Sequence, residues 1–562
     1  MKVIIVGGVA GGATAGARIR RLDESAEITI FERTGYISYA NCGLPYYIGG
    51  VIKDSEDLTL QTPESFYSRY RIDVKVNCEV TDIDAANKTV SVINLKSGER
   101  FKEKYDKLIL SPGAKPALPD FYIPHERVFT LRTVEDTLAI RNFILSAKPK
   151  SAVVTGGGFI GIETAENLCE AGIKVTLVQR GGHILNTVDE DIAAFIHAKL
   201  RSKGITLMLN ADVKKITPES NGLCVEFGDG LKLKTDMALV ATGVVPENAL
   251  AKNAGLELGV KGAIKVNLKM QTSAPDVYAV GDAVEVTDYV TGQNAVIALA
   301  GPANKQGRIA ADNVCGIKSE YKGSQGSSVI KIFDMTVAST GINEARAKTA
   351  GYDYEKLILS PASHAGYYPG GKVMTLKLIY EKNTLKILGA QIAGYDGVDK
   401  RIDVLATAIR AGMTAVQLKD LDLAYAPPYS SAKDPVNMAG FMAENIESGL
   451  VKQFHYADVP ELQKRKDVVL LDARTEEEYL YGHADGFINI PLDDLRRRYT
   501  EIDKDKPVYV MCQSGLRSYV ASRILAQYGF NVYNFSGGYR LYRTILNEEL
   551  AASECYPCGK NK

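Results

Sequence analysis

The chain has 562 residues, and its 67 Lys and Arg residues balance its 67 Asp and Glu residues, so the formal net charge is zero. This length predicts about three to five domains, and the zero net charge excludes a general basic field that would attract nucleic acid or an acidic membrane. A hydrophobic content of 46% with 24% charged residues is typical of a globular protein and excludes a disordered, collagen-like or coiled-coil chain.

The sequence also lacks the signals of a membrane or secreted protein. No run approaches about 18 uncharged apolar residues, the length that a membrane-spanning helix needs. The start, MKVIIVGGVAGGA, resembles a mature N-terminus, because one Lys precedes an apolar strand that leads into glycines. The 8 cysteines are too scattered for a disulfide scaffold. We therefore expect a cytoplasmic protein with no membrane or nucleic-acid partner.

A glycine-rich turn near the start of the chain predicts a dinucleotide-binding site. The pattern predicts a strand over 2–6, a helix over 13–21 and a second strand over 27–32 that ends in Glu32. Glycines in such a turn let a pyrophosphate approach N–H groups at a helix N-terminus, and the acid can accept from a ribose hydroxyl. A tight turn without a ligand is the alternative. The glycines concerned are Gly7, Gly8, Gly11 and Gly12.

A second glycine-rich turn repeats this pattern. Gly156, Gly158 and Gly161 form a GxGxxG motif after an apolar strand, and the next strand, over 174–178, ends in Gln179 and Arg180. Because the strand does not end in an acid and Arg180 can pair with a 2′-phosphate, the sequence does not distinguish NADH from NADPH as the cofactor. Two such turns predict two dinucleotides, or a dinucleotide and a relative.

Three further short strands end in small residues. They read LILSPG over 108–113, LVATG over 239–243 and DVYAVGD over 276–282, and they deliver Gly113, Gly243, Gly281 and Asp282 to turns. With the two glycine motifs, this order resembles the flavoprotein disulfide reductases that bind two dinucleotides. The resemblance implies FAD and a nicotinamide cofactor, with Asp282 near the ribityl and phosphate part of FAD.

The sequence has one cysteine where a dithiol reductase would have a CxxxxC pair. This is Cys42, in SYANCGLPYYIGG, which resembles the single-cysteine branch of coenzyme A disulfide reductases, NADH oxidases and NADH peroxidases. A lone thiolate cannot close an internal disulfide, so it would cycle through a mixed disulfide, a persulfide or a sulfenate. A cysteine that packs as a small hydrophobe is the alternative.

Two tyrosine segments favour the coenzyme A branch. HAGYYPG and AYAPPYSSAKDP place Tyr367 and Tyr425 where, by resemblance, a Tyr from the second subunit approaches the cysteine and the flavin. A phenol can donate a proton to a departing thiolate while neutral at pH 7. We interpret Tyr368 and Tyr429 as packing residues. The arrangement implies a homodimer.

The same resemblance implies a coenzyme A groove lined by the first helix and by the segment after the redox cysteine. Tyr70 replaces the basic residue expected there, so Arg69 or Arg71 would complete a phosphate clamp. Coenzyme A binding is expected at Thr14, Arg18, Arg21, Ser38, Asn41, Arg69, Tyr70, Arg71 and, from the second subunit, Lys433.

A different domain follows in the last quarter of the chain. The pattern predicts a strand over 508–511 and a helix over 518–525, joined by a loop that holds Cys512, Gly515 and Arg517. This CxxGxR loop resembles that of the rhodanese domain, where loop N–H groups and the Arg stabilise a thiolate and its persulfide. A phosphatase loop would need CxxxxxR. We expect Asp472, Arg474 and His483 to be structural.

The predicted fold class is therefore α/β, with two Rossmann-like dinucleotide-binding domains, an α+β dimerisation domain and an α/β rhodanese domain. The expected boundaries are an FAD domain at 1–115 and 246–322, an NAD(P)H domain at 116–245, a dimerisation domain at 323–445, a linker at 446–455 and a rhodanese domain at 456–562.

This fusion implies an FAD-dependent NAD(P)H oxidoreductase that reduces coenzyme A persulfide, polysulfide or coenzyme A disulfide through Cys42, with Cys512 relaying sulfur. The alternatives are an NADH oxidase or peroxidase with a Cys42 sulfenate, and a sulfurtransferase whose flavin half resets it. The preferred acceptor and the route of sulfur between Cys512 and Cys42 stay open.

The remaining cysteines give weaker signals. Cys555 and Cys558 form a CxxC pair at the chain end, which is either a frayed tail or an acceptor of sulfur or electrons from Cys512. A zinc site would need two more ligands, so we predict no metal. The contexts of the other cysteines favour packing roles; these are Cys78, Cys169, Cys224 and Cys315.

Overall fold

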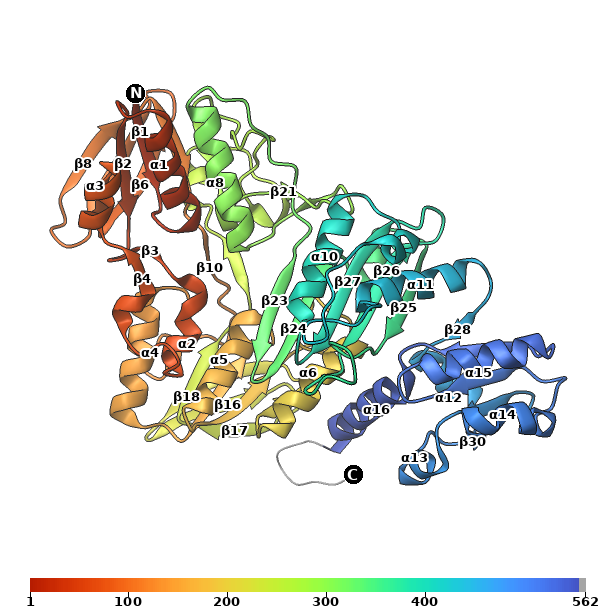
Figure 1. The fold of residues 1–562 in the computed structure, drawn as a ribbon. Coiled ribbons are helices and arrows are strands. Elements are labelled where there is room, and N and C mark those ends of the chain that lie inside the picture. The colour runs from red at the N-terminus through yellow and green to blue at the C-terminus, as the bar shows by residue number, and fades with distance from the viewer. Residues whose placement is uncertain (555–562) are drawn as a thin grey trace. The chain divides into compact units, whose positions relative to one another are not determined.

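The computed structural model describes residues 1–554 and divides into two compact units (Figure 1). The N-terminal unit comprises Met1–Gly182 and Gly204–Gly326, and the C-terminal unit comprises His183–Lys203 and the chain from Ser327 onward. None of the helices within residues 1–554 combines the length and the apolar character that crossing a membrane requires.

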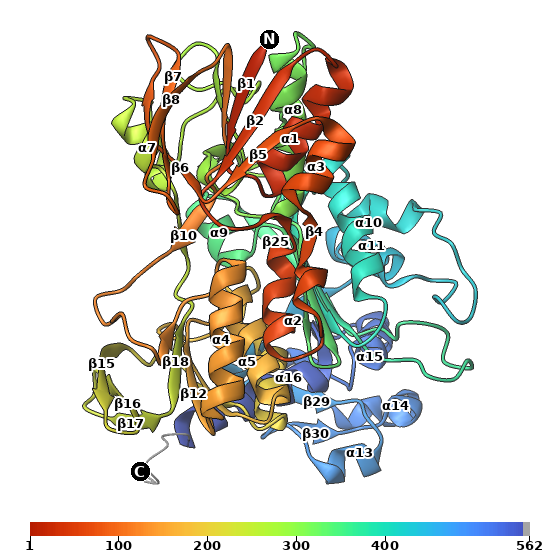
Figure 2. The ribbon, with the colours of Figure 1, turned by 90° about the vertical axis from the view of Figure 1, so that its left-hand side faces the viewer.

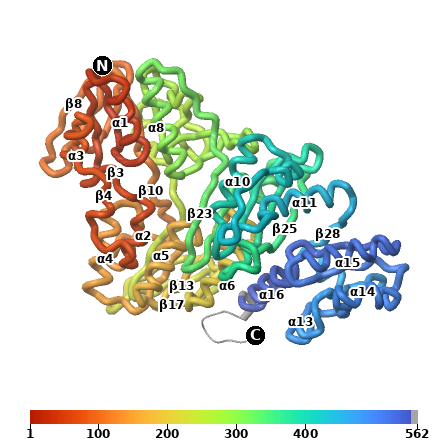
Figure 3. The backbone as a smooth tube through the Cα atoms, viewed as in Figure 1, coloured from red at the N-terminus to blue at the C-terminus, as the bar shows by residue number. Residues whose placement is uncertain are grey.

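The first sheet of the N-terminal unit is a parallel five-stranded sheet in the order β20-β9-β1-β2-β5. Helices α1 and α8 lie side by side along it (Figures 1 and 3). They approach so closely that a Cβ atom at Gly307 would clash with the carbonyl oxygen of Gly11. The bounds are β1 Lys2–Val6, β2 Glu27–Glu32, β5 Asp73–Val76, β9 Lys107–Leu110, β20 Val277–Ala279, α1 Ala10–Leu22 and α8 Ala300–Val314.

The second sheet of this unit is also parallel, in the order β11-β18-β12-β13-β14. Helices α4 and α5 belong to it, and the short helix α2, just after Cys42, packs against both (Figure 2). The bounds are β11 Val128–Phe129, β12 Ser151–Thr155, β13 Lys174–Val178, β14 Thr206–Met208, β18 Met237–Val240, α2 Leu44–Ile48, α4 Val134–Ala147 and α5 Phe159–Glu170.

Smaller elements complete the N-terminal unit. Two three-stranded antiparallel sheets contain β6 Cys78–Asp84, β7 Thr89–Asn94 and β8 Arg100–Lys104, and β15 Val213–Glu219, β16 Gly222–Phe227 and β17 Lys232–Thr235. Short pairs and helices are β3 Ile37–Tyr39, β4 Thr59–Gln61, β10 Ala114–Pro116, β19 Val244–Pro246, β21 Val286–Thr287, β22 Asn294–Ala295, α3 Pro63–Tyr70 and α7 Ala249–Asn253.

The C-terminal unit begins with an antiparallel sheet in the order β23-β24-β27-β26-β25. Helix α6 packs in this unit, against β23, β27 and α16, although its residues lie within the range 116–245 expected for the NAD(P)H domain. The bounds are β23 Ser328–Ile332, β24 Met335–Gly341, β25 Tyr354–Leu359, β26 Thr375–Glu381, β27 Ile387–Gly394, α6 Glu190–Ser202, α9 Glu344–Thr349, α10 Val398–Arg410 and α11 Pro435–Glu447.

The last sheet is parallel, in the order β28-β32-β31-β29-β30. Its edge strand β28 lies within 446–455, the range expected as a linker. This segment joins the sheet because Phe454 is buried against Phe535 and Tyr509. The bounds are β28 Lys452–Phe454, β29 Val469–Asp472, β30 Ile488–Asn489, β31 Val508–Met511, β32 Val532–Phe535, α12 Val459–Leu462, α13 Glu476–Tyr481, α14 Leu492–Arg498, α15 Leu516–Gln527 and α16 Gly538–Glu554.

The predicted fold class is confirmed. The strands predicted over 2–6, 27–32, 174–178 and 508–511 are observed with those bounds. Helix α1 begins at Ala10 rather than at residue 13, because Gly11 and Gly12 lie in its first turn instead of in the loop before it.

Candidate functional site

The first glycine turn connects β1 to α1. Gly7 has a φ of +94°, and a Cβ atom there would clash with the carbonyl oxygen of Ser111. A Cβ atom at Gly12 would clash with the carbonyl oxygen of Gly7. The N–H of Gly8 donates to Oε2 of Glu32 at 2.9 Å. The turn therefore holds the start of the helix close to the end of β2, as a pyrophosphate-binding turn requires.

The second glycine turn has the same construction. Gly156 has a φ of +102°, and a Cβ atom there would clash with the carbonyl oxygen of Ala241. A Cβ atom at Gly161 would clash with the carbonyl oxygen of Gly156. The N–H of Gly157 donates to Oε1 of Gln179 at 3.0 Å, so Gln179 occupies the place that Glu32 has in the first turn.

One departure from the usual glycine spacing has a simple explanation. Val9 and Gly158 are the N-cap residues of α1 and α5, with φ values of −98° and −83°. Neither value lies in the left-handed region, so a residue with a side chain fits there without strain. Gly243, by contrast, has a φ of +120° in the turn after β18. Arg180 is exposed.

The turns after β9 and β20 hold the other residues predicted to bind FAD. Gly113 has a φ of +72°, and Gly281 and Asp282 form a 3-10 turn, Gly281–Ala283. Asp282 accepts a hydrogen bond from Arg132 at 2.9 Å, and the N–H of Gly281 donates to Gln306 at 2.7 Å. Arg132 and Gln306 were not predicted from the sequence, because no local pattern marks them.

Cys42 is an exposed thiol in the 3-10 turn Asn41–Gly43. Desolvation by the surrounding protein raises the pKa of the Cys42 thiol, and the carboxylates of Glu163 and Asp282 raise it further, whereas Arg132 lowers it. Asp282 comes from the predicted FAD site, and Glu163 lies in α5, the helix that follows the second glycine turn. The thiol therefore lies within electrostatic range of groups from both dinucleotide folds.

Glu163 is a functional candidate that the sequence did not reveal. Its Oε1 accepts a hydrogen bond from the phenol of Tyr46 at 3.3 Å, and Tyr46 lies four residues after Cys42. Burial raises the pKa of Glu163 to about 7. A carboxyl group with this pKa changes its charge near neutral pH, within electrostatic range of Cys42.

We expect Glu163→Gln to make Cys42 more reactive above pH 7. A negative carboxylate disfavours the neighbouring thiolate and so raises the pKa of Cys42; its neutral replacement lowers that pKa. The rate of Cys42 alkylation, followed from pH 6 to 10, should therefore shift to lower pH. Glu170→Gln, at an exposed position of the same helix, is the control. Identical profiles for wild type and Glu163→Gln would contradict the assignment.

The residues expected to line a coenzyme A groove on α1 have partners within the N-terminal unit. Thr14 donates to Asn304 at 2.5 Å, and Arg18 forms an ion pair with Asp312 at 2.8 Å. Arg21 is exposed, and Ser38 has a φ of +43°. Because Asp312 neutralises Arg18, the exposed Arg21 is the more available cation on this helix.

The segment around Tyr70 lies beside α1. Arg20 is buried and donates to the carbonyl oxygens of Tyr70 at 2.7 Å and Arg71 at 2.9 Å, so it fixes the end of α3 against the first helix. Tyr70 packs against Phe66, with ring centroids 5.1 Å apart. Arg69 is exposed. The two arginines that flank Tyr70 remain the predicted phosphate clamp.

Tyr367 and Tyr425 meet in the C-terminal unit. Their phenol oxygens are 2.5 Å apart, and this hydrogen bond raises the pKa of Tyr367. The side chains are 74% and 46% exposed. The two predicted tyrosines are therefore adjacent on the surface of this unit, although 58 residues separate them.

A buried arginine explains why these two segments meet. Arg401 is 1% exposed and donates to the carbonyl oxygens of Ser363 at 2.9 Å and Tyr429 at 3.2 Å. It also pairs with Asp434 at 2.9 Å. Arg401 thus joins the segment before Tyr367 to the segment after Tyr425. Lys433, next to Asp434, is exposed.

The rhodanese-type loop is closed around its cysteine. Cys512 is 0% exposed, and the N–H of Gly515, which has a φ of +100°, donates to its Sγ at 3.2 Å. Arg517 makes two hydrogen bonds to Glu478, at 2.6 and 2.7 Å. The N–H of Tyr539 donates to the carbonyl oxygen of Cys512 at 2.7 Å. These contacts within the domain hold the loop and its arginine in place.

We expect Arg517→Gln to lower sulfur transfer from a sulfane-sulfur donor such as thiosulfate by about tenfold. The change removes a positive charge near Cys512 and leaves the Glu478 carboxylate without its partner, and both effects disfavour a thiolate. The double variant Arg517→Gln with Glu478→Gln should recover part of the loss, because it removes that carboxylate. A double variant slower than Arg517→Gln would contradict this account.

Two predicted residues cannot be placed. Cys555 and Cys558 lie outside the described residues, so their role stays a prediction.

Comparisons with known proteins agree with this arrangement. Residues 1–307 match the pyridine nucleotide-disulphide oxidoreductase family, residues 327–435 match its dimerisation domain, and residues 456–544 match the rhodanese-like domain. A coenzyme A disulfide reductase from Staphylococcus haemolyticus is 38% identical over 446 residues, which is 79% of this chain and 100% of that protein.

Two solved structures are similar along nearly the whole chain. Reduced Bacillus anthracis CoADR-RHD is 48% identical with a TM-score of 0.94, covering 97% of this chain and 98% of that one. A NAD-dependent persulfide reductase from A. fulgidus is 39% identical with a TM-score of 0.92, covering 96% of this chain and 100% of that one. The chain therefore belongs to the pyridine nucleotide-disulphide oxidoreductase family and carries a rhodanese-like domain after the dimerisation domain.

Proposed function

We propose that this chain is a flavin-dependent NAD(P)H oxidoreductase that reduces coenzyme A disulfide, coenzyme A persulfide or polysulfide through Cys42. The observation that carries the proposal is the position of this exposed thiol, whose pKa responds to Asp282 from one dinucleotide fold and to Glu163 from the other. The relatives named coenzyme A disulfide reductase and persulfide reductase support the same activity.

The two glycine turns fit two dinucleotides, because in each turn two glycines, Gly7 and Gly12 or Gly156 and Gly161, lie so close to a backbone carbonyl that a Cβ atom would clash. Gly7, Gly8, Gly11, Gly12, Glu32, Gly113, Gly281 and Asp282 would hold FAD, and Gly156, Gly158, Gly161, Gln179, Arg180 and Gly243 would hold NAD(P)H. When bound, these cofactors supply the two electrons that return oxidised Cys42 to a thiolate.

The chemistry of the chain itself begins with the Cys42 thiolate. It attacks a sulfur of coenzyme A disulfide, so that a Cys42–coenzyme A mixed disulfide forms and one coenzyme A thiolate leaves. With coenzyme A persulfide, the thiolate attacks the inner sulfur, which is bonded to carbon of coenzyme A. This attack forms the same mixed disulfide and releases HS⁻. In both cases one S–S bond breaks and one forms, and two electrons are needed to reset the cysteine.

The tyrosine pair would supply the proton for the departing group. Tyr367 and Tyr425 share a hydrogen bond, so one phenol remains a donor toward a leaving thiolate while the other stabilises the resulting phenolate. We place this pair at the Cys42 of the partner subunit, in a homodimer formed through the dimerisation domain. The coenzyme A phosphates would then contact Arg21, Arg69 and Arg71 of one subunit and Lys433 of the other.

The rhodanese-like domain would prepare the substrate. We propose that Cys512 carries sulfane sulfur as a persulfide, stabilised by the Gly515 N–H and by Arg517, and passes it to coenzyme A. The six cysteines within the described residues are free thiols, which supports a reducing compartment such as the cytoplasm.

Anaerobic turnover tests this function directly. With NADH and NADPH tried separately, we expect coenzyme A disulfide and coenzyme A persulfide to be reduced faster than peroxide, and faster than O₂ in a separate aerobic assay without a sulfur substrate. Cys512→Ser should keep coenzyme A disulfide reduction and lose the use of a sulfane-sulfur donor. Peroxide or O₂ reduction at matching rates would instead support an oxidase with a Cys42 sulfenate.

A further inference from the structure

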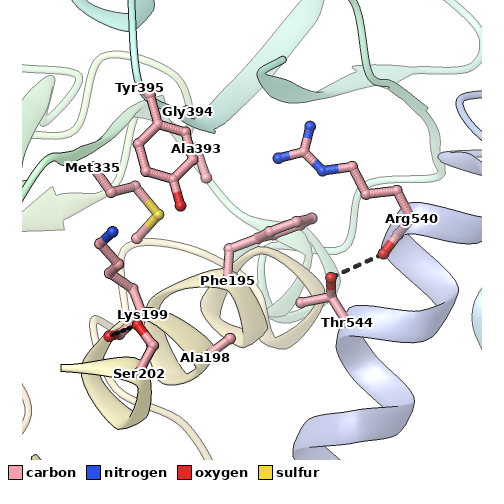
Figure 4. Close-up of a pocket in the computed structure, with 10 residues that line it drawn as sticks. All are labelled: Phe195, Ala198, Lys199, Ser202, Met335, Ala393, Gly394, Tyr395, Arg540 and Thr544. Atoms are coloured by element: carbon pink, nitrogen blue, oxygen red, sulfur yellow. Dashed lines mark hydrogen bonds between the residues drawn. The ribbon is translucent and has the colours of Figure 1, made fainter. Parts of the chain in front are cut away.

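A cavity of about 310 Å³ lies in the C-terminal unit, between α6, the sheet and α16 (Figure 4). Its lining belongs neither to the redox cysteine nor to the rhodanese loop. Apolar atoms come from Phe195, Ala198, Met335 and Ala393, and polar groups come from Lys199, Tyr395 and Arg540. The cavity therefore lies between helix α16 of the rhodanese-like domain and the antiparallel sheet that contains β24 and β27.

Arg540 is the most informative residue of the cavity. Its half-buried guanidinium extends over the ring of Phe195, 5.6 Å from the ring centroid, and points toward the cavity (Figure 4). Among the side chains of residues 1–551, no carboxylate forms an ion pair with it. Burial lowers the pKa of Arg540. A partly desolvated cation without a counter-charge is unfavourable, so an anion in the cavity would offset this cost.

A second cation lies on the opposite wall. The ammonium of Lys199 is 5.0 Å from the ring centroid of Tyr395, and its ion-pair partner Asp334 has a side chain that is 65% exposed. Figure 4 shows Lys199 and Arg540 on opposite sides, with the phenol oxygen of Tyr395 directed between them. The cavity thus presents the Arg540 guanidinium, the Lys199 ammonium in an ion pair with the exposed Asp334, a hydrogen-bonding phenol and two aromatic rings.

The size and chemistry of the cavity restrict the ligand. Its volume corresponds to about ten water molecules, which exceeds the needs of a single phosphate and reaches the lower range for organic ligands. Rings such as those of Phe195 and Tyr395 can stack on a planar base. Two separated cations suit two phosphate groups that are not adjacent in the ligand.

We propose that this cavity binds a nucleoside that carries two separate phosphate groups, with Arg540 on one phosphate and Lys199 on the other. The inference does not depend on the proposed reaction. Such a ligand would hold α16 against α6. The N–H of Arg540 donates to the carbonyl oxygen of Gln513 at 3.2 Å, so occupancy would also steady the loop of Cys512.

Hydrogen–deuterium exchange of the full flavin-loaded chain tests this site, with adenosine 3′,5′-bisphosphate as the probe. We expect slower exchange in peptides from α6 and the start of α16. Location by peptide separates this site from any binding at the dinucleotide turns or the predicted coenzyme A groove. Arg540→Gln should weaken the effect about tenfold or more, as judged from the probe concentration at half-protection.

Two further variants make the result decisive. Lys199→Met should also weaken binding, and Arg543→Gln should not, because Arg543 is an exposed residue of the same helix that lies over Tyr481 rather than in the cavity. Unchanged exchange in α6 and α16, or equal protection in wild type and Arg540→Gln, would overturn the site. Equal protection by inorganic phosphate alone would overturn the nucleoside as its ligand.

Discussion

Replacement of Cys42 by Ser is expected to lower NAD(P)H-driven reduction of coenzyme A disulfide by about a thousandfold or more. Serine keeps the size of the side chain, but its hydroxyl does not form a nucleophilic anion near neutral pH and cannot enter a disulfide. Steady-state turnover under anaerobic conditions measures the loss. The flavin absorbance of the variant should remain, because Cys42 lies outside the glycine turns that we propose as the dinucleotide sites.

Cys169→Ser is the matched control for this experiment. Cys169 lies in α5, is half-buried and has no proposed role, so its variant should retain most of the activity. Sulfur transfer by Cys512 should survive in Cys42→Ser, because that reaction uses a different loop. Turnover of Cys42→Ser at the rate of the wild type would contradict the proposed mechanism.

The second large effect is expected at Lys377, a residue of β26 that sequence analysis did not identify. Lys377 is 0% exposed and contacts three carboxylates, at 2.9 Å for Asp189, 2.7 Å for Asp191 and 2.5 Å for Glu344. Burial alone would lower the pKa of Lys377, but the three acids outweigh this effect and raise it. The network fixes α6 and α9 to the antiparallel sheet.

We expect Lys377→Met to lower the free energy of unfolding by about 3 to 5 kcal/mol, because it leaves the buried Asp189 and the half-buried Asp191 without their shared cation. That loss is large beside the total of about 5 to 15 kcal/mol that stabilises a typical protein. Urea denaturation followed by circular dichroism measures it. Lys382→Met, at an exposed lysine just beyond β26, should have almost no effect. Equal midpoints for Lys377→Met and wild type would contradict the role of the network.

The sequence predicted those parts of the site whose chemistry depends on local backbone geometry. Gly7 and Gly156 are required by turns in which a side chain would clash, so their spacing is visible in the sequence alone. The loop of Cys512 is likewise a continuous segment between a strand and a helix. Tyr367 and Tyr425 are adjacent through a hydrogen bond, and their role at one site stays a prediction.

The partners of these residues could not be predicted, because each reaches its site through contacts between residues that are distant in the sequence. Arg132 donates to Asp282, which lies 150 positions away in the sequence. Arg401 joins two distant segments, and no sequence motif around Arg401 marks this role. Two packing arrangements were also not visible in the sequence. Helix α6 packs in the C-terminal unit, and β28 joins the last sheet, because burial of distant side chains determines where these segments pack.

In the proposed mechanism a single thiol, Cys42, forms a covalent bond with the coenzyme A substrate. The most direct test is to reduce the protein, remove the reductant without oxygen, add one equivalent of coenzyme A disulfide and locate the adduct by peptide mass spectrometry. We predict one coenzyme A group on the peptide that contains Cys42, released on addition of NADH or NADPH. A coenzyme A group found only on another cysteine, or none at all, would contradict the account.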